Sequence, residues 1–358
     1  MIRARPHIEA MAPYALADLS LPDGRQAVSL AQNESAFAPS PLAIEAARAA
    51  MGGAALYPDA DWTGLRAALA DVHGIDPASI LCGSGSMELI SAMIAAFAGP
   101  GDEVLSTEHG YALFRTAAEA AGAGYRSVME PGLAVSVDAV LAGVSPATKI
   151  VCVANPGNPT GTVIASAELV RLREQLPEDT LLLIDEAYAE FADQPPLWHL
   201  TGRGDTVVMR TFSKAYGLAG MRIGWGVFPR TIGAETRKLL NPNNISVAAQ
   251  AAAAAATRDQ SYMVGVVAKT AMLRNRFSAR VSCGSIRPIP GRANFVLLQF
   301  ANAEAAISAD SALRAGGILM RRVSGYGLPD CLRATIGRED TMDRAADILT
   351  EWANGEAR

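Results

Sequence analysis

The sequence predicts an α/β protein made of a large domain, with a mostly parallel sheet covered by helices, and a smaller α+β domain. Between residues 79 and 214, short apolar runs alternate with helical segments. This alternation is typical of right-handed crossovers between parallel strands. After about residue 280, strand-like runs follow one another before a last helix. The 358 residues suffice for two such domains.

Three regions are expected along the chain. The N-terminal arm is predicted to pack with the small domain, and Pro6, Pro13 and Pro22 prevent a long helix in it. The arm, the large domain and the small domain are expected at residues 1–30, 31–260 and 261–358.

The first elements after the arm are a short strand from Ser29 and two helices. Pro41 suits the first turn of a helix over 41–51, and Gly74 is expected to end an amphipathic helix that begins near Asp61. In the alternating region, strands are expected near residues 79, 102, 124, 149, 180 and 206, and helices at 86–99, 112–122, 138–144 and 165–176. In the tail, one long helical segment is expected at about 245–279, strands near 286, at 293–300, 317–322 and 331–337, and a last helix from about 341.

Composition excludes several classes of function. The net charge of −5 argues against a surface for nucleic acid or anionic membranes. The most apolar stretch, 89–99, is too short to cross a bilayer, and the N-terminus lacks an apolar signal core. The four cysteines are scattered, and there are only four histidines, so no metal site is expected. A cytoplasmic protein with reduced thiols is the simplest account.

Polar residues follow five of the predicted strands. Ligands of open parallel sheets bind at the carboxyl ends of the strands. The residues expected there are Gly83 to Ser86, Tyr111, Asn155 to Asn158, Asp185 with Tyr188, and Lys214. We therefore expect them to converge on one pocket.

Lys214 lies in the stretch that we consider the centre of this site. Thr211 and Ser213 flank it, and Arg222 follows eight residues later. Two hydroxyls and a guanidinium can hold a phosphate, while the amine forms a Schiff base with a carbonyl cofactor. A lysine in a glycine-rich loop could equally face solvent. The polar residues at the ends of the other strands favour the interpretation as a cofactor site.

Asp185 and the turn before residue 86 complement such a cofactor. Asp185 ends the apolar run LLLI, where an unpaired carboxylate is costly and a cationic pyridine nitrogen is a fitting partner. Gly85 and Ser86 open a helix whose N-terminus can hold a phosphate. A capping aspartate and an ordinary strand–helix turn are the alternative interpretations.

Three further residues suit a pyridine ring. Asn158 and Tyr188 can hydrogen-bond a ring hydroxyl, and Tyr111 can stack on the ring face. Tyr111 could instead be a half-buried core residue.

These residues occur in motifs that resemble a known family. The motifs NES, YPDAD, GSGSMELI, ANPGNPTG, DEAYAEF, TFSKAYGLAGMRIGW, PGRANFVLL and GYGLPDCLRATIG are similar to those of fold-type I pyridoxal-phosphate aminotransferases. The resemblance is closest to the histidinol-phosphate aminotransferase group and runs from about Ser29 to about residue 350. It implies pyridoxal 5′-phosphate as cofactor, a homodimer and a role in histidine biosynthesis.

The resemblance also implies a role for each cofactor-binding residue. Lys214 would carry the cofactor, and Asp185 would pair with its ring nitrogen. Asn158 and Tyr188 would hold the ring hydroxyl, Tyr111 would stack on the ring, and Tyr57 would reach the cofactor phosphate in the neighbouring subunit. The other phosphate ligands would be Gly85, Ser86, Thr211, Ser213 and Arg222.

For the substrate, the resemblance implies two arginines. Arg333 would clamp an α-carboxylate in a bidentate fork, with Asn33 nearby, and Arg321 and Tyr14 would contact a substrate phosphate. The chain departs from the family at three places. These are His109 and Gly110 in place of Pro-Thr before Tyr111, Met87 in place of an acidic residue, and the segment 241–249.

Four functions follow from these patterns. The first is a ping-pong aminotransferase that converts histidinol phosphate and 2-oxoglutarate to imidazole acetol phosphate and glutamate. The alternatives are an aminotransferase for phenylalanine, tyrosine or tryptophan, and a threonine-phosphate decarboxylase. A regulator that binds the cofactor without turnover ranks below these, because the chain has no segment typical of an added DNA-binding domain.

Overall fold

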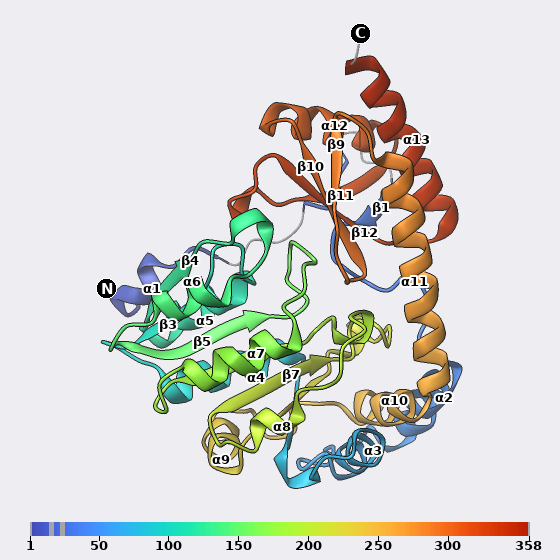
Figure 1. The fold of residues 1–358 in the computed structure, drawn as a ribbon. Coiled ribbons are helices and arrows are strands. Elements are labelled where there is room, and N and C mark those ends of the chain that lie inside the picture. The colour runs from blue at the N-terminus through green and yellow to red at the C-terminus, as the bar shows by residue number, and fades with distance from the viewer. Residues whose placement is uncertain (1, 14–17, 22–25, 357–358) are drawn as a thin grey trace.

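The computed structural model describes residues 2–13, 18–21 and 26–356. Two sheets lie one above the other, each with its own helices (Figure 1). The larger sheet has seven strands and the smaller one has five. The predicted α/β class, with a mostly parallel sheet and a smaller α+β part, is confirmed.

The larger sheet is built from the alternating region of the sequence. Its strands are, in spatial order, β2 (Ile80–Gly83), β8 (Gly224–Val227), β7 (Thr206–Thr211), β6 (Leu181–Asp185), β5 (Thr148–Ala154), β3 (Glu103–Thr107) and β4 (Gly124–Val128). The strands from β7 to β4 pair in parallel, and β8 runs antiparallel to both of its neighbours. The carboxyl ends of the parallel strands therefore meet at one edge of the sheet.

Both faces of the larger sheet are buried. In β5, Ile150 and Cys152 belong to one apolar cluster, whereas Val151 and Val153 belong to another. Successive side chains of a strand point to opposite faces, so the two clusters lie on the two sides of the sheet. The first cluster draws on helices α2 (Pro41–Ala50), α3 (Thr63–His73), α4 (Ser86–Phe97), α5 (Ala112–Ala121) and α10 (Val247–Arg258). The second draws on α6 (Val137–Gly143) and α7 (Ser166–Gln175). This is why the strands read as continuous apolar runs.

The smaller sheet combines the end of the arm with the tail. Its order is β1 (Val28–Leu30), β11 (Ile318–Arg322), β12 (Cys331–Thr335), β10 (Phe295–Phe300) and β9 (Ile286–Ile289). β1 pairs in parallel with β11, and the other pairs are antiparallel. One apolar cluster packs this sheet against helices α11 (Gln260–Val281), α12 (Ala303–Ala315) and α13 (Glu339–Glu356).

The helices begin and end largely at the expected signals. Pro41 is the first residue of α2, whose Ser40 cap accepts a hydrogen bond from the Leu42 N–H at 3.1 Å. Gly74 ends α3 with φ +65°, a conformation that glycine adopts without strain. The helices are α1 (Pro6–Ala10), α2 (Pro41–Ala50), α3 (Thr63–His73), α4 (Ser86–Phe97), α5 (Ala112–Ala121), α6 (Val137–Gly143), α7 (Ser166–Gln175), α8 (Trp198–Thr201), α9 (Arg230–Arg237), α10 (Val247–Arg258), α11 (Gln260–Val281), α12 (Ala303–Ala315) and α13 (Glu339–Glu356). The short 3-10 helices are η1 (Met51–Gly53), η2 (Pro77–Ser79), η3 (Pro131–Leu133), η4 (Ala189–Phe191), η5 (Ala219–Met221) and η6 (Ser324–Tyr326).

Two expectations about elements were wrong. The segment 245–279 is not one helical stretch, because Asp259 leaves helical geometry and caps α11 through the Tyr262 N–H. The sequence interpretation also missed β8, which completes the buried sheet between β2 and β7.

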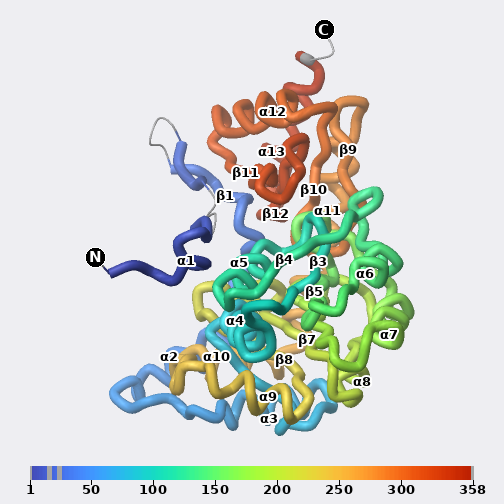
Figure 2. Tube along the Cα trace, turned by 90° about the vertical axis from the view of Figure 1, so that its left-hand side faces the viewer, coloured from blue at the N-terminus to red at the C-terminus, as the bar shows by residue number. Residues whose placement is uncertain are grey.

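The arm contacts both parts of the molecule. Figure 2 shows α1 beside α5, and β1 close to β11. Asp18 also forms an ion pair with Arg314 of α12 at 3.1 Å. The described parts of the arm therefore contact elements of both sheet layers.

Candidate active site

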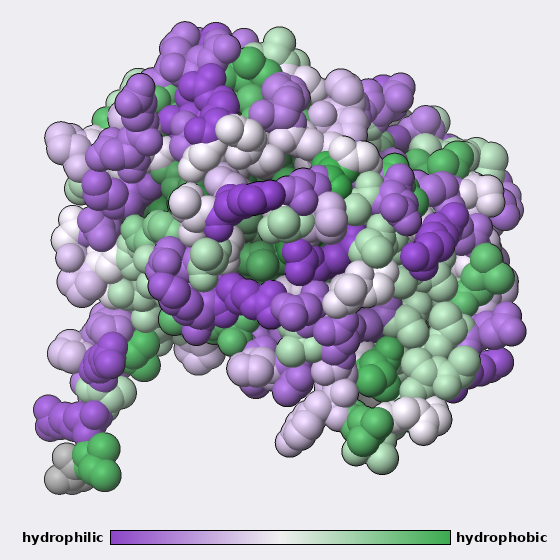
Figure 3. All heavy atoms as spheres, turned by 90° about the horizontal axis from the view of Figure 1, so that it is seen from below, coloured by the Kyte–Doolittle hydropathy of each residue, from purple (hydrophilic) through white to green (hydrophobic). Residues whose placement is uncertain are grey.

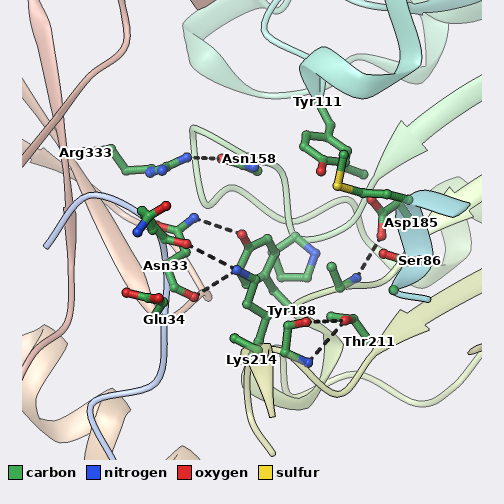
Figure 4. A pocket seen from close by; sticks show the side chains of 18 of the residues that line it. Asn33, Glu34, Ser86, Tyr111, Asn158, Asp185, Tyr188, Thr211, Lys214 and Arg333 are labelled. Carbon is green, nitrogen blue, oxygen red and sulfur yellow. Dashed lines mark hydrogen bonds between the residues drawn. The ribbon is translucent and has the colours of Figure 1, made fainter. Parts of the chain in front are cut away.

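A pocket of about 410 Å³ lies where the carboxyl ends of the larger sheet face the smaller sheet. Thirteen of the residues predicted for the site line it (Figure 4). They are Asn33, Gly85, Ser86, Tyr111, Asn158, Asp185, Tyr188, Thr211, Ser213, Lys214, Arg222, Arg321 and Arg333. The fold thus brings together residues that lie up to 300 positions apart, from Asn33 to Arg333.

Lys214 follows the end of β7 and points into the pocket (Figure 4). Its Nζ donates to the carbonyl of Asn33 at 2.9 Å and lies 5.7 Å from the centre of the Tyr188 ring. Burial, followed by the positive charge of Arg333, lowers the pKa of Lys214 to about 7. A lysine in this state supplies a neutral amine at neutral pH, as a nucleophile or a base requires.

Asp185 is the last residue of β6 and is only 4% exposed. Its Oδ1 accepts the backbone N–H of Ala187 at 3.1 Å. Burial raises the pKa of Asp185 to about 7. A buried carboxylate is stabilised by a cation, so this side of the pocket suits a ligand with a protonated nitrogen.

The N-terminus of α4 forms a third part of the pocket. Gly85 precedes the helix with φ +84°, and a Cβ there would lie 2.7 Å from Nη2 of Arg222. Gly224 of β8 packs so closely that a Cβ on it would lie 2.3 Å from the backbone nitrogen of Ser86. The first N–H groups of a helix and a guanidinium together make an anion site.

Two hydroxyl side chains lie beside the anion site. Thr211 Oγ1 donates to Ser213 Oγ at 3.0 Å and accepts the Ser213 N–H at 3.1 Å. Arg222 has φ +52°, and its Nη1 donates to the carbonyl of Ala219 at 3.0 Å. The chain therefore turns back after Lys214, and Arg222 lines the same pocket as the hydroxyls of Thr211 and Ser213.

Asn33 connects the smaller sheet to the pocket floor. Its Nδ2 donates to the hydroxyl of Tyr188 at 2.8 Å, and its Oδ1 accepts from Thr335 Oγ1 at 3.1 Å. Burial raises the pKa of Tyr188 to about 12, so the phenol keeps its proton. Asn33 therefore contacts β12 at Thr335, two residues along the strand from Arg333.

The two arginines that were predicted to bind the substrate lie opposite each other on adjacent strands. Arg321 of β11 pairs in register with Arg333 of β12, and both line the pocket. Arg333 donates to Asn158 Oδ1 at 2.5 Å and to the carbonyl of Ala31 at 2.8 Å. Like charges opposite each other destabilise a sheet, and an anionic ligand between them offsets this cost.

Of the other two predicted residues, one lies outside this pocket and the other outside the described residues. Tyr57 is 88% exposed and is not part of its lining. Tyr14 lies outside the described residues. Tyr111 does reach the pocket, and its ring also packs edge-on against Phe114, with 5.7 Å between the ring centres.

The sequence interpretation missed several residues of the site. Asn294 is 2% exposed and donates to the backbone carbonyls of Asn33 and Glu34 at 3.1 and 3.2 Å, which fixes the segment that carries Asn33. Tyr326 and Glu34 line the pocket without having been assigned a role. Asn294 lies in the PGRANFVLL motif, so that motif was the available signal.

Two other types of site are absent from the described chain. Within residues 2–13, 18–21 and 26–356, no three His, Cys, Asp or Glu side chains are placed to hold a metal ion. In the same ranges, no helix combines the length and the apolar character needed to span a bilayer.

The chain is similar to known aminotransferases over nearly its whole length. It is 43% identical to the histidinol-phosphate aminotransferase of Rhodospirillum centenum over 355 residues, 98% of each chain. It is also 43% identical to that of Dinoroseobacter shibae over 327 residues, 91% of each chain.

Solved structures show the same architecture. The histidinol-phosphate aminotransferase of Sinorhizobium meliloti, in complex with pyridoxal 5′-phosphate, superposes with a TM-score of 0.90 at 30% identity over 99% of both chains. A mutant aspartate aminotransferase of Thermus thermophilus shares the fold, with a TM-score of 0.86 at 20% identity over 98% of this chain and 100% of that one. A family model for aminotransferase class I and II matches residues 25–349. The chain therefore belongs to the aminotransferase class I and II family.

Proposed function

We propose that the chain is a pyridoxal-phosphate-dependent aminotransferase that converts histidinol phosphate and 2-oxoglutarate to imidazole acetol phosphate and glutamate. The observation that carries this proposal is the cross-strand pair Arg321 and Arg333, which places two cations on one wall of the pocket that holds Lys214. The relatives from Rhodospirillum centenum and Dinoroseobacter shibae carry the same activity in their names.

The pocket fits pyridoxal phosphate in charge and in donor set. Its ring nitrogen, when protonated, satisfies Asp185, whose carboxylate is buried with one backbone donor on Oδ1. Its phosphate suits the N-terminus of α4 with Thr211, Ser213 and Arg222. When bound, the cofactor supplies an electrophilic carbon for the amino group and a conjugated ring that withdraws electrons from it.

Lys214 provides the amine and the base. Because the pKa of its side chain falls to about 7, a large fraction of the amine is neutral at neutral pH, and Lys214 would hold the cofactor through this nucleophilic amine. The same Nζ faces the pocket and can take the proton that leaves the substrate Cα. The carbonyl of Asn33 accepts a hydrogen bond from Nζ and so orients the amine between these tasks.

Asn158, Tyr188 and Tyr111 would position the ring. Asn158 and Tyr188 lie on the pocket wall and can each hydrogen-bond a ring hydroxyl, although in this structure they bond Arg333 and Asn33. Tyr111 lies on the side of the pocket that carries Asp185 and Ser86, where its ring can stack on the cofactor (Figure 4). Asp185 would keep the ring nitrogen protonated.

The two arginines account for both substrates. The α-carboxylate of glutamate or 2-oxoglutarate suits the fork of Arg333. Histidinol phosphate carries a phosphate ester in place of that carboxylate, and its extra negative charge suits the second guanidinium, Arg321. We propose that Tyr14 adds a further contact to this phosphate.

A homodimer completes the site in this proposal. Tyr57 and Leu56 are exposed by 88% and 76%, and Met51 and Leu42 of the same region are also exposed. Figure 3, the view from below, shows apolar side chains on its right-hand side. Helices α2, α3 and α10 lie on the same side in Figure 1. We propose that this region contacts a second copy and that Tyr57 of each subunit reaches the cofactor phosphate of the other.

The proposed location is the cytoplasm, with a role in histidine biosynthesis. Cys82, Cys152, Cys283 and Cys331 are all free, as expected of a protein in a reducing compartment.

Glutamate formation from different amino donors tests the function. Purified protein is loaded with pyridoxal phosphate and given 2-oxoglutarate with histidinol phosphate, phenylalanine or threonine phosphate. We expect kcat/KM for histidinol phosphate to exceed that for phenylalanine by about a hundredfold or more, because the carboxylate of phenylalanine supplies less negative charge to Arg321 than the phosphate ester does.

Each alternative function predicts a different result. A preference for phenylalanine would assign the chain to the aromatic aminotransferases. Release of carbon dioxide from threonine phosphate without glutamate would assign it to the decarboxylases. No turnover with any donor would leave a cofactor-binding regulator. The Lys214→Ala variant serves as the inactive control in all three assays.

A further inference from the structure

His109 lies in the tight turn between β3 and α5, directly before the segment that carries Tyr111. The N–H of Gly110 donates to the carbonyl of Thr107 at 2.9 Å. A Cβ on Gly110 would lie 2.8 Å from Ser106 Oγ and 2.9 Å from that carbonyl. Only glycine fits this position without a shift of its neighbours. Gly110 therefore allows the tight turn that places His109.

The path brings the imidazole of His109 to the segment that follows β11. Its Nδ1 lies 2.7 Å from the carbonyl oxygen of Tyr326, which is 217 positions away in the chain. A carbonyl oxygen only accepts, so Nδ1 carries the proton and donates it. His109 is 6% exposed, and this hydrogen bond is part-buried, which reduces the competition from water.

Other contacts fix the position of this residue. The backbone N–H of His109 donates to Glu130 Oε1 at 3.3 Å, and Nε2 lies 4.0 Å from Glu108 Oε2. Gly327, with φ +76°, lies next to the ring, since a Cβ there would be in ordinary contact with it at 3.8 Å. The imidazole is thus held between the turn of the larger sheet and the loop of the smaller one.

Both ends of the hydrogen bond adjoin the pocket. Tyr111 lines it from the larger sheet, and Tyr326 lines it from the smaller sheet, four residues after Arg322 ends β11. His109 itself is not part of the lining. The bond therefore spans the two sides of the pocket without reaching a substrate.

We infer that His109 is a positioning residue that holds Tyr111 and Tyr326 at a fixed separation across the substrate end of the pocket. This inference deepens the proposed function and rests on it for the identity of the amino donor. Without the bond, the carbonyl of Tyr326 loses its buried donor and the two segments can move apart. The apparent affinity for substrate then falls in proportion to the fraction of molecules in which the pocket is correctly formed.

Two substitutions of similar size separate the hydrogen bond from packing. In His109→Asn, the side-chain amide can donate from nearly the position of Nδ1, whereas the side chain of His109→Leu has no donor. We expect His109→Leu to raise the KM for the amino donor about tenfold, with kcat changed less than about twofold, since one buried hydrogen bond is lost. His109→Asn should stay within about threefold of the unchanged protein in KM. His199→Leu, at an exposed histidine of α8, is the matched control and should change neither value.

Hydrogen exchange supplies a readout that does not depend on activity. In the cofactor-loaded protein without substrate, amides of residues 108–114 and 323–328 should exchange faster in His109→Leu than in His109→Asn or the unchanged protein. The absorbance of the bound cofactor should be the same in all four proteins. If the two His109 variants have equal KM values and equal exchange, the hydrogen bond does not position the pocket.

Two further outcomes separate this inference from the proposed function. Loss of the cofactor in His109→Leu would mean that the turn supports cofactor binding, and would overturn the positioning role. If the unchanged protein uses no amino donor, the proposed function fails, but the exchange comparison still decides whether His109 ties the two segments together.

Discussion

Lys214 and Asp185 have pKa values that burial moves in opposite directions. The pKa of the Lys214 amine falls to about 7 and the pKa of the Asp185 carboxyl rises to about 7. In the cofactor-free chain, burial therefore favours the neutral form of each group. A ligand with an electrophilic carbon and a cationic nitrogen satisfies both groups at once. We therefore infer that ligand binding offsets the free-energy cost of burying these two groups.

The first prediction concerns Asp185 in the cofactor-free protein. In the folded state the pKa of Asp185 is about 7, whereas in the unfolded state it returns to the ordinary aspartate pKa of about 3.8. Between these values the folded state binds more protons, so the free energy of unfolding falls as the pH rises. At pH 7.5, Asp185→Asn should raise the free energy of unfolding by about 1–3 kcal/mol, because no buried charge remains. Thermal unfolding of the cofactor-free protein at several pH values measures this.

The same substitution should weaken cofactor binding. An amide cannot pair with a protonated ring nitrogen as a carboxylate does. Equilibrium dialysis should therefore show weaker retention of pyridoxal phosphate by Asp185→Asn. A variant that is less stable at pH 7.5 and binds the cofactor normally would contradict both parts of the account.

The second prediction separates two adjacent arginines. Arg321 is half-buried in the pocket wall and opposite Arg333, whereas Arg322 is exposed. Arg321→Gln should raise the KM for histidinol phosphate by about tenfold or more and that for 2-oxoglutarate less, because only the phosphate needs the second cation. It should also stabilise the protein by about 0.2–1 kcal/mol, since the like-charge pair is removed. Equal effects on both substrates, or equal effects of Arg322→Gln, would exclude the assignment.

At the scale of elements, the anion site depends on how closely β8 approaches α4. Gly224→Ala would place a Cβ 2.3 Å from the backbone nitrogen of Ser86, so the helix N-terminus must shift. We expect a loss of about 1–3 kcal/mol of stability and weaker cofactor binding.

Gly265 of α11 offers the matched control for this third prediction. A Cβ on it meets nothing within 4 Å. Gly265→Ala should stabilise the protein by about 0.5–1 kcal/mol through helix propensity and leave cofactor binding unchanged. Chemical denaturation and cofactor titration of both variants check this, and a Gly224→Ala variant that binds normally would contradict the proposed anion site.

The elements that sequence predicts well are those with a clear apolar pattern. The buried strands β5 and β6 and the helices that end at Gly74 and Gly122 follow directly from local sequence. β8 was missed because its four residues alternate glycine with Trp225 and Val227, and the glycines interrupt the apolar run that marks the other strands. The break at Asp259 was missed because helix-forming residues continue on both sides, and only the capping hydrogen bond reveals it.

At the scale of the whole molecule, the sequence predicted which residues converge but not how they contact one another. The strand-end rule explains why Asp185 and Lys214 meet. The hydrogen bond from Asn33 to Tyr188 joins residues 155 positions apart and depends on how the smaller sheet is placed over the larger one. No local pattern encodes that placement. The division of the chain at residues 30 and 260 stays a prediction.

The fourth prediction tests the proposed dimer by complementation. Tyr57→Ala and Lys214→Ala should each be nearly inactive. When the two are co-expressed, each mixed dimer has one site with both Lys214 and the partner's Tyr57 intact, so roughly a quarter of the full activity should return. No recovery, together with a monomer mass in solution, would contradict the contribution of Tyr57 across an interface.

The most direct test of the central claim is an absorbance titration of the cofactor-loaded protein without any oxo acid. Histidinol phosphate at low concentration should remove the visible band of the lysine-bound cofactor and release one equivalent of imidazole acetol phosphate, while phenylalanine at the same concentration leaves the band unchanged. If phenylalanine removes the band and histidinol phosphate does not, the pocket with Arg321 and Arg333 does not recognise a substrate phosphate, and the proposed function is wrong.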